Sequence, residues 1–103
     1  MRAQLLKLHK GKSTKAERVF AELCKELRIP FRAKVRIAGR EVDFLIGTYA
    51  IEIDGHEQII HKNSLVLELG YTPVHFSNDD VLDDRDSTKQ SIQSLWQEHE
   101  TQN

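Results

Sequence analysis

The segment 40–55 constrains the fold more than any other part of the chain, and it reads REVDFLIGTYAIEIDG. Apolar and polar residues alternate on both sides of Gly47 and Thr48, which is the period of two expected of β-strands. A glycine at the first central position favours a two-residue type II′ hairpin turn. If these two residues form the turn, Ile46 faces Tyr49 across the hairpin.

This register brings negative charges together on one face of the hairpin. Asp43 lies directly across from Glu52, and Glu41 lies across from Asp54. Like charges directly opposite one another destabilise a sheet, so these carboxylates need a compensating cation. Hard oxygen donors clustered in this way favour Mg²⁺ or Mn²⁺ over zinc. The hairpin therefore predicts a metal site.

The strand that precedes the hairpin offers a second way to neutralise these acids. Apolar residues from Phe31 to Ile37 alternate with Arg32, Lys34 and Arg36, which predicts a strand with one apolar and one basic face. The basic face suits contacts with phosphate groups. Alternatively, it is the solvent side of an edge strand, or its cations pair with the hairpin acids.

A helix is expected before this strand. Thr14 and Glu17 have capping-box spacing, and Pro30 ends the helix at about Arg28. Glu17 lies at the edge of the apolar stripe on a helical wheel, so it can reach a site between helix and sheet. The alternative is that Glu17 only completes the cap.

The second half of the chain predicts further elements of the same domain. They are a helix over about 57–69 that ends at Gly70, a strand over about 71–77 with Pro73 near its start, a short helical piece within 79–87, and a last helix from about Ser87. We expect a basic N-terminal arm over 1–12, one domain over 13–98 and a frayed tail over 99–103.

Charge divides the chain into a basic and an acidic half. Residues 1–40 carry 12 Lys and Arg against 3 Glu, whereas residues 41–103 carry 3 Lys and Arg against 13 Asp and Glu. Such asymmetry indicates that one surface binds a polyanion. The alternative is that folding mixes the charges and leaves no patch.

Length and composition fit a single cytoplasmic domain. A chain of 103 residues is large enough for one modest core. No apolar run approaches the about 20 residues of a membrane span, so no membrane partner is expected. Cys24 is the only cysteine, which excludes an internal disulfide and predicts a buried thiol in a reducing compartment.

Several short motifs together resemble the core of the PD-(D/E)xK nuclease superfamily, and in particular small proteins related to very short patch repair endonucleases. The matching residues are Glu17, Val42-Asp43-Phe44, Ile51-Glu52-Ile53-Asp54-Gly55, Gly70-Tyr71 and Val74-His75-Phe76. The resemblance covers about residues 13–98. Each motif is short, and their order and spacing carry the specificity.

The resemblance implies an α/β fold with a restriction-endonuclease-like three-layer core and a mixed four-stranded sheet. It also implies Mg²⁺- or Mn²⁺-dependent hydrolysis of DNA phosphodiester bonds, by a nickase or a structure- or mismatch-directed repair nuclease. Asp43, Glu52 and the backbone carbonyl of Ile53 would bind the metal, and Glu17 would contact it through water. The basic residues expected to hold the DNA backbone are Arg32, Lys34, Arg36 and Arg40.

Two positions depart from the pattern of this superfamily. Asp54 replaces the lysine of the ExK triplet, and Gln58 stands where relatives usually carry a histidine. Lys62 or Gln58 would supply part of the missing role, and His56 is a candidate general base. The alternative function is a catalytically degenerate DNA-binding or accessory module. A homodimer or a larger repair or restriction partner stays open.

Overall fold

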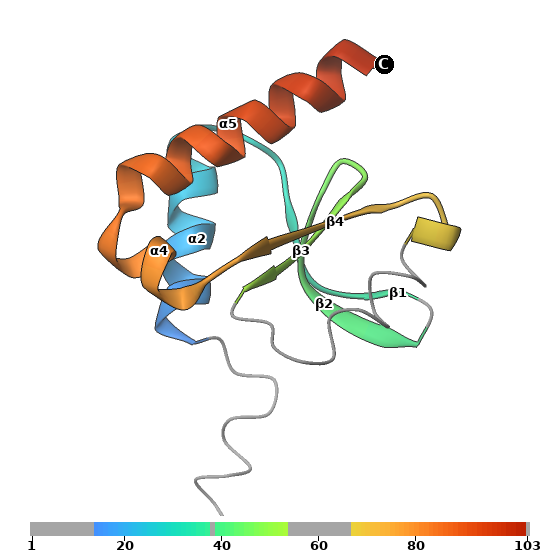
Figure 1. The fold of residues 1–103 in the computed structure, drawn as a ribbon, viewed down its shortest axis with the longest axis horizontal. Coiled ribbons are helices and arrows are strands. Elements are labelled where there is room, and N and C mark those ends of the chain that lie inside the picture. The colour runs from blue at the N-terminus through green and yellow to red at the C-terminus, as the bar shows by residue number, and fades with distance from the viewer. Residues whose placement is uncertain (1–13, 38, 54–66, 103) are drawn as a thin grey trace, which may run out of the picture.

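The computed structural model describes residues 14–37, 39–53 and 67–102. Its elements, in chain order, are α2 (Lys15–Glu26), β1 (Arg32–Ile37), β2 (Arg40–Ile46), β3 (Tyr49–Ile53), β4 (Thr72–Phe76), α4 (Asn78–Asp83) and α5 (Arg85–Gln102) (Figure 1). The expected N-terminal arm and most of the expected helix over 57–69 lie outside the described residues. Leu67 and Glu68 are helical and Gly70 has φ +93°, which agrees with the predicted end of that helix.

The four strands form one mixed sheet in the order β1-β2-β3-β4. The first three are antiparallel neighbours, and β4 runs parallel to β3, which confirms the predicted sheet. The hairpin register is also confirmed, because Ile46 pairs with Tyr49 and Phe44 with Ile51. Gly47 has φ +57°, the left-handed value that the first position of a type II′ turn requires.

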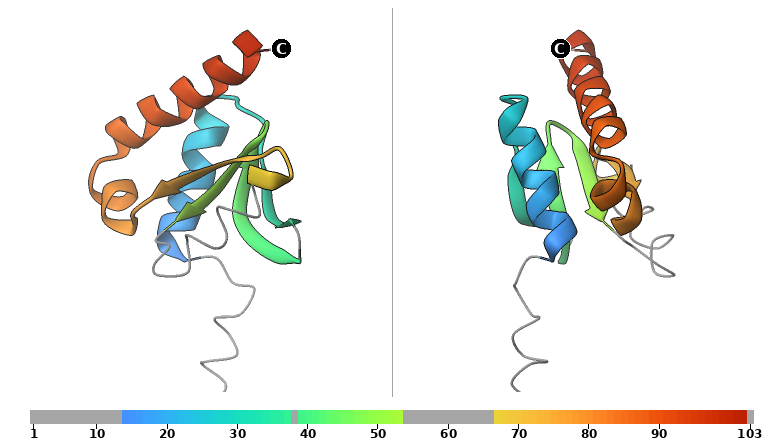
Figure 2. Two further views of the ribbon diagram at one scale, coloured as in Figure 1. Left: turned by 45° about the vertical axis from the view of Figure 1, so that its right-hand side comes forward. Right: turned by 90° about the vertical axis from the view of Figure 1, so that its left-hand side faces the viewer.

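One apolar core joins the three described helices to one face of the sheet (Figure 2). The ring of Phe20 on α2 stacks on Phe44 with centroids 4.9 Å apart and meets Phe76 of β4 edge-on at 5.1 Å. Val81 of α4 and Ile92 of α5 are fully buried in the same cluster. This packing holds the first turn of α2 against the strands that carry the predicted acids.

A second, smaller apolar cluster contains Ile37, Val42 and Ala50. Ala50 precedes Ile51 in β3, so the two side chains point to opposite faces of the sheet. Val42 packs with Ala50, whereas Phe44 packs in the helix-facing core with Ile51. Val42 and Phe44 therefore point to opposite faces of the sheet, although strict alternation would place both side chains on the same face. The alternation of β2 is broken at Asp43.

The C-terminal ends of helices α2 and α5 differ from the expected bounds. Helix α2 ends at Glu26, and Arg28 follows in a left-handed conformation with φ +58°. The amide of Ile29 donates to the carbonyl of Cys24 at 3.0 Å, which is the long hydrogen bond of a Schellman motif. The helix is therefore closed two residues earlier than the proline position suggests.

The expected frayed tail is helical instead, since α5 continues to Gln102. The ring of His99 packs on Trp96 with centroids 5.1 Å apart, and the hydroxyl of Thr101 donates to the carbonyl of Gln97 at 2.8 Å. Within the described ranges, the helices are too short or too polar to cross a membrane. Cys24 is buried as predicted, and this burial raises the pKa of its thiol to about 12.

Candidate active site

Asp43 lies where strands β2 and β3 separate. The paired register runs from Ile46 and Tyr49 to Phe44 and Ile51. At the next step, the backbone N–H of Ile53 donates to Asp43 Oδ2 at 2.8 Å. A side-chain oxygen thus takes a donor that an antiparallel ladder would give to a main-chain carbonyl. The carboxylate is fixed in the fork between the strands.

Glu17 approaches this fork from the first turn of α2. Its carboxylate accepts a hydrogen bond from the backbone N–H of Thr14 at 3.2 Å, and the Thr14 hydroxyl accepts from the Glu17 amide at 3.1 Å. The residue is only 8% exposed and also forms an ion pair with Lys34. Glu17 therefore completes the capping box and also interacts with Asp43. A role in the cap and a role in the site are compatible. Glu17, Asp43 and Glu52 are called the acid cluster below.

Asp43 lies in a buried and negatively charged environment. Its pKa is raised to about 7, mainly by burial; the hydrogen bond from the Ile53 amide opposes this rise, and the charges of Glu17 and Glu52 add to it. The Asp43 carboxyl therefore holds a proton more readily than an exposed carboxyl does. A bound metal ion would displace that proton.

Lys34 does not lie with the arginines of its strand. Its ammonium nitrogen is 3.0 Å from Glu17 Oε1. Burial lowers the pKa of Lys34, but the hydrogen bond to Glu17 and the charges of Glu17, Asp43 and Glu41 outweigh it and raise the pKa overall. Lys34 has φ +58°, so the strand is distorted where it passes Asp43. The predicted continuous basic face is therefore interrupted at this residue.

The three predicted arginine contacts to DNA are exposed. Arg36 donates to the carbonyl of Gly39 at 2.9 Å and lies opposite Glu41 in the register of β1 and β2. Arg32 lies opposite Leu45, and Arg40 pairs with Ile37. Their register partners are therefore residues of β2 other than Asp43 for Arg32 and Arg36, and Ile37 of β1 for Arg40.

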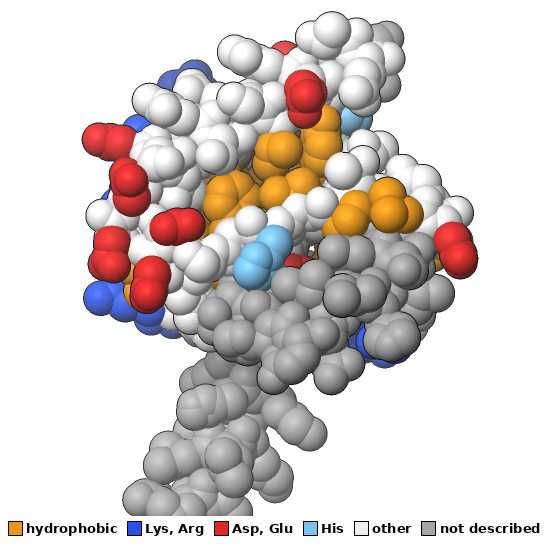
Figure 3. Space-filling model, viewed as in Figure 1, with side chains coloured by type: hydrophobic (Ala, Val, Ile, Leu, Met, Phe, Trp, Pro, Cys, Tyr) orange, Lys and Arg blue, Asp and Glu red, His pale blue; other side chains and the backbone are white. Residues whose placement is uncertain are grey.

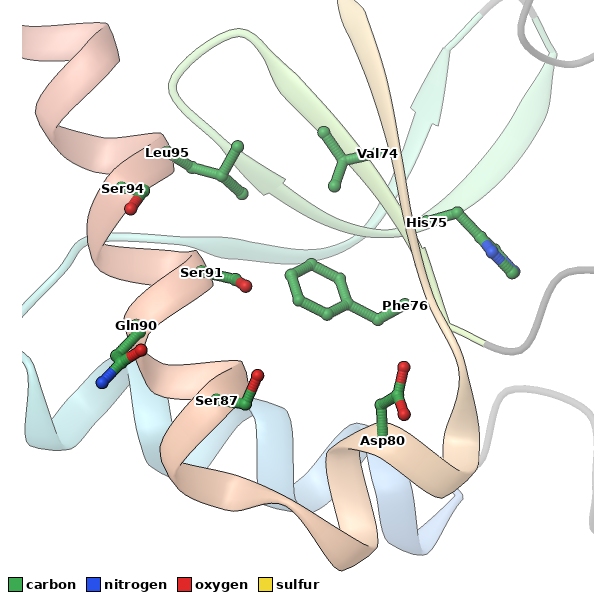
Figure 4. A pocket seen from close by; sticks show the side chains of 9 residues that line it. All are labelled: Val74, His75, Phe76, Asp80, Ser87, Gln90, Ser91, Ser94 and Leu95. Atoms are coloured by element: carbon green, nitrogen blue, oxygen red, sulfur yellow. The ribbon is translucent and has the colours of Figure 1, made fainter.

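His75 joins the site through the parallel pairing of β3 with β4. It lies opposite Glu52 in the register, so both side chains project from the same face of the sheet. Figure 4 shows the ring pointing away from Phe76 and from α5. No role is predicted for His75 from the sequence alone, and the signal that could have found it is the crossover from β3 to a parallel strand.

Several expected site residues lie outside the described residues. They are Asp54, His56, Gln58 and Lys62. Their predicted roles, and the predicted pairing of Glu41 with Asp54, stay predictions.

The donor set of the fork fits a hard divalent cation. In the described parts of the chain, no three His, Cys, Asp or Glu side chains already converge on one point. Mg²⁺ is commonly held by one or two carboxylates, with waters and substrate oxygens completing its shell. Asp43, Glu52 and the carbonyl oxygen of Ile53 are oxygen donors of the type that such an ion accepts, and they stay the predicted ligands.

A groove beside α5 does not contain the carboxylates of Glu17, Asp43 or Glu52. It has a volume of about 570 Å³ and runs between β4 and α5 (Figure 4). Val74, Phe76 and Leu95 form its apolar floor, and serines of α5 line its wall. Apolar side chains are visible in the hollow of this face in Figure 3. Neither Glu17 nor the hairpin acids line the groove, so its size does not identify the reactive site.

Comparison with known proteins gives a consistent result. The chain is similar to a solved structure described as the homing endonuclease I-Bth0305I catalytic domain, with a TM-score of 0.73 and 30% sequence identity. The match covers 84% of this chain and 98% of that domain. No family model and no curated protein matches the chain. The mixed sheet and its helices thus form a restriction-endonuclease-like core, and the chain belongs to the same family of endonuclease catalytic domains as I-Bth0305I.

Proposed function

We propose that this protein is a metal-dependent DNA endonuclease whose reactive centre is the fork between β2 and β3. The observation that carries the proposal is the environment of Asp43, whose pKa is raised to about 7, mainly by burial and further by the charges of Glu17 and Glu52. Perturbed carboxylates of this kind are typical of functional sites. The resemblance to PD-(D/E)xK and very short patch repair nucleases and the kinship with an endonuclease domain support the same chemistry.

The reaction is hydrolysis of a phosphodiester. A water oxygen forms a bond to phosphorus while the bond from phosphorus to one ester oxygen breaks. The water gives up a proton to a base, and the departing oxygen takes up a proton. Asp43, Glu52 and the carbonyl of Ile53 would hold Mg²⁺ or Mn²⁺, which when bound acidifies water and stabilises charge on the phosphoryl group.

The remaining roles fall to residues of this chain. Glu17, whose charge acts on Asp43, would orient a water at the fork. His75, which lies opposite Glu52 in the register, would accept the proton of the attacking water, and His56 is the alternative from sequence. Arg32, Arg36 and Arg40 are exposed on β1 and β2 and would hold the phosphate backbone.

Charge elsewhere on the surface supports one DNA-facing side. Acidic side chains gather over α4 and the start of α5, as Figure 3 shows at its left. These acids repel a polyanion, whereas the arginines of β1 and β2 attract one. The duplex is therefore expected to approach the strand edge that β1 forms. A chain of 103 residues has little surface left for reading bases after it holds phosphates. This favours structure-directed or partner-directed cleavage, such as nicking at a mismatch.

The second candidate function is a DNA-binding module that has lost turnover. Asp54 in place of the superfamily lysine favours it. This module would bind DNA with a strong dependence on salt and release no product with any divalent metal. Multiple turnovers by the wild-type chain would exclude it.

Plasmid cleavage with Mg²⁺ or Mn²⁺ tests the main proposal. We expect Asp43→Ala and Glu52→Ala each to lower the rate by about 10³-fold, because each removes a proposed metal ligand. Glu100→Ala removes an exposed carboxylate from α5 and is the matched control, which should cleave like wild type. Cleavage that survives both hairpin substitutions would refute the assignment.

A further inference from the structure

Within residues 14–37, 39–53 and 67–102, the lysine that brings positive charge into the acid cluster is Lys34. Lys34 Nζ lies 3.0 Å from Glu17 Oε1, and the two side chains are 30% and 10% exposed. The charges of Asp43 and Glu41 act on the same ammonium group. Lys34 thus interacts with carboxylates contributed by α2 and β2 together, although it belongs to neither element.

The backbone at Lys34 is held in an unfavourable conformation. Its φ of +58° is left-handed, and only Arg28 shares this property among the described non-glycine residues. Arg28 closes a helix, where left-handed residues are common. Lys34 lies in the middle of β1, and the register of β1 with β2 passes over Lys34 and Asp43. Strain in mid-strand with no turn to explain it is characteristic of functional sites.

The distortion of the backbone at Lys34 changes the direction of its side chain. Val35 packs in the smaller cluster on one face of the sheet, whereas the side chain of Lys34 reaches Glu17 on the helix-facing side. A local change of strand geometry of this kind redirects a side chain. The left-handed conformation of Lys34 therefore costs conformational free energy, and it places an ammonium group at the fork.

We propose that Lys34 is a positioning residue of the nuclease site, an assignment that rests on the proposed function. In the metal-free protein its ammonium pairs with Glu17, next to Asp43. When a divalent cation neutralises these acids instead, the ammonium group becomes available to hold the scissile phosphate against the fork. Lysine suits this task because its charge is compact and its stem is flexible.

Two other arrangements of Lys34 make different predictions. If it only held the DNA backbone, as its neighbour Arg36 is expected to do, its loss would weaken DNA binding and leave metal binding unchanged. If it were only structural, it would resemble Lys89, whose Nζ is also 3.0 Å from a glutamate of α2, Glu26. The Lys89–Glu26 pair is more exposed, which makes Lys89→Met the matched control.

The test compares Lys34→Met with Lys89→Met in the full chain by calorimetric titration with Mn²⁺ and by single-turnover cleavage of a DNA duplex at saturating protein. Removing a competing positive charge should tighten Mn²⁺ binding by Lys34→Met by roughly threefold to tenfold. The cleavage rate should fall by about 10²-fold, because a cation that stabilises phosphoryl charge is lost. Lys89→Met should match wild type in both measurements.

Two more variants guard against a folding artefact. Lys34→Gly removes the same side chain but relieves the left-handed backbone, so it should fold at least as well as wild type and show the same two changes. Lys34→Arg keeps the charge and should recover wild-type Mn²⁺ affinity. An unchanged Mn²⁺ affinity in Lys34→Met and Lys34→Gly, or an unchanged cleavage rate in both, would overturn the proposal.

Failure of this inference is distinguishable from failure of the proposed function. Wild-type protein that neither binds Mn²⁺ nor cleaves DNA contradicts the nuclease assignment itself. Wild-type protein that does both, with Lys34 variants that match it, contradicts only the role of Lys34.

Discussion

The two ends of helix α2 carry the same ion pair in different surroundings. Glu17 in the first turn and Glu26 in the last each lie 3.0 Å from a lysine Nζ. The glutamate side chain is 10% exposed in the first pair and 55% in the second. Distance alone therefore does not separate a site from a surface contact. What separates them is burial and the nearby uncompensated charge of Asp43.

The largest expected difference between the two ends is in catalysis. Glu17→Gln keeps a side chain that can complete the capping box but removes the negative charge from the fork. We expect single-turnover cleavage to fall by about 10²-fold, whereas Glu26→Gln should cleave at the wild-type rate. Equal rates for the two variants would mean that Glu17 serves only the helix cap.

The stability of the metal-free protein should depend on pH through Asp43, which interacts with Glu17 at the first turn of α2. The pKa of Asp43 is raised to about 7 in the folded chain, above its usual value of 3.8, so the folded state binds the extra proton between these limits. The free energy of unfolding in EDTA should therefore fall as pH rises from 4 to 7. After allowance for solvent screening we expect a loss of about 1–2 kcal/mol.

Asp43→Asn is the variant that isolates this contribution, because it mimics the protonated carboxyl. Denaturant titrations at several pH values should show a flatter profile and a more stable metal-free protein above pH 7. Asp83→Asn, which alters an exposed acid of α4, should leave the profile as in wild type. A wild-type profile in Asp43→Asn would place the excess charge elsewhere.

The smallest expected effect is at the last turn of α2. Lys89→Met should lower the free energy of unfolding by less than about 0.5 kcal/mol, because exposed ion pairs contribute little. The difference should vanish in 1 M salt, where exposed charges are screened. Thermal unfolding at low and high salt would measure it. A larger loss that persists in salt would show that Lys89 packs on the helix through its aliphatic stem.

The contrast also shows which parts of the structure the sequence could predict. Local rules were sufficient for the capping box of Thr14 and Glu17 and for the hairpin register that pairs Ile46 with Tyr49. In each case the interacting groups are three residues apart. The restriction-endonuclease-like core followed from the resemblance, whose motifs span most of the chain.

Longer-range features of the site were not predictable in this way. Nothing in a strand pattern signals the left-handed conformation of Lys34 or its contact with Glu17, which lies 17 residues earlier in the chain. The pairing of His75 with Glu52 depends on where the crossover returns to the sheet. The end of α5 was missed because His99 lies against the hairpin turn at Gly47, and Glu98 accepts a hydrogen bond from Tyr49, only in the folded molecule.

Because Cys24 is buried, the rate at which its thiol is labelled reports how often the folded protein opens. The thiol is fully buried in the core between α2 and the sheet, and no other cysteine is present in the sequence. A thiol reagent reacts with the thiolate, which both burial and a pKa of about 12 suppress in the folded state. The rate of labelling of the unmodified protein therefore measures how often the core around Cys24 opens. Metal bound at the fork, about two turns of α2 away, should slow this labelling.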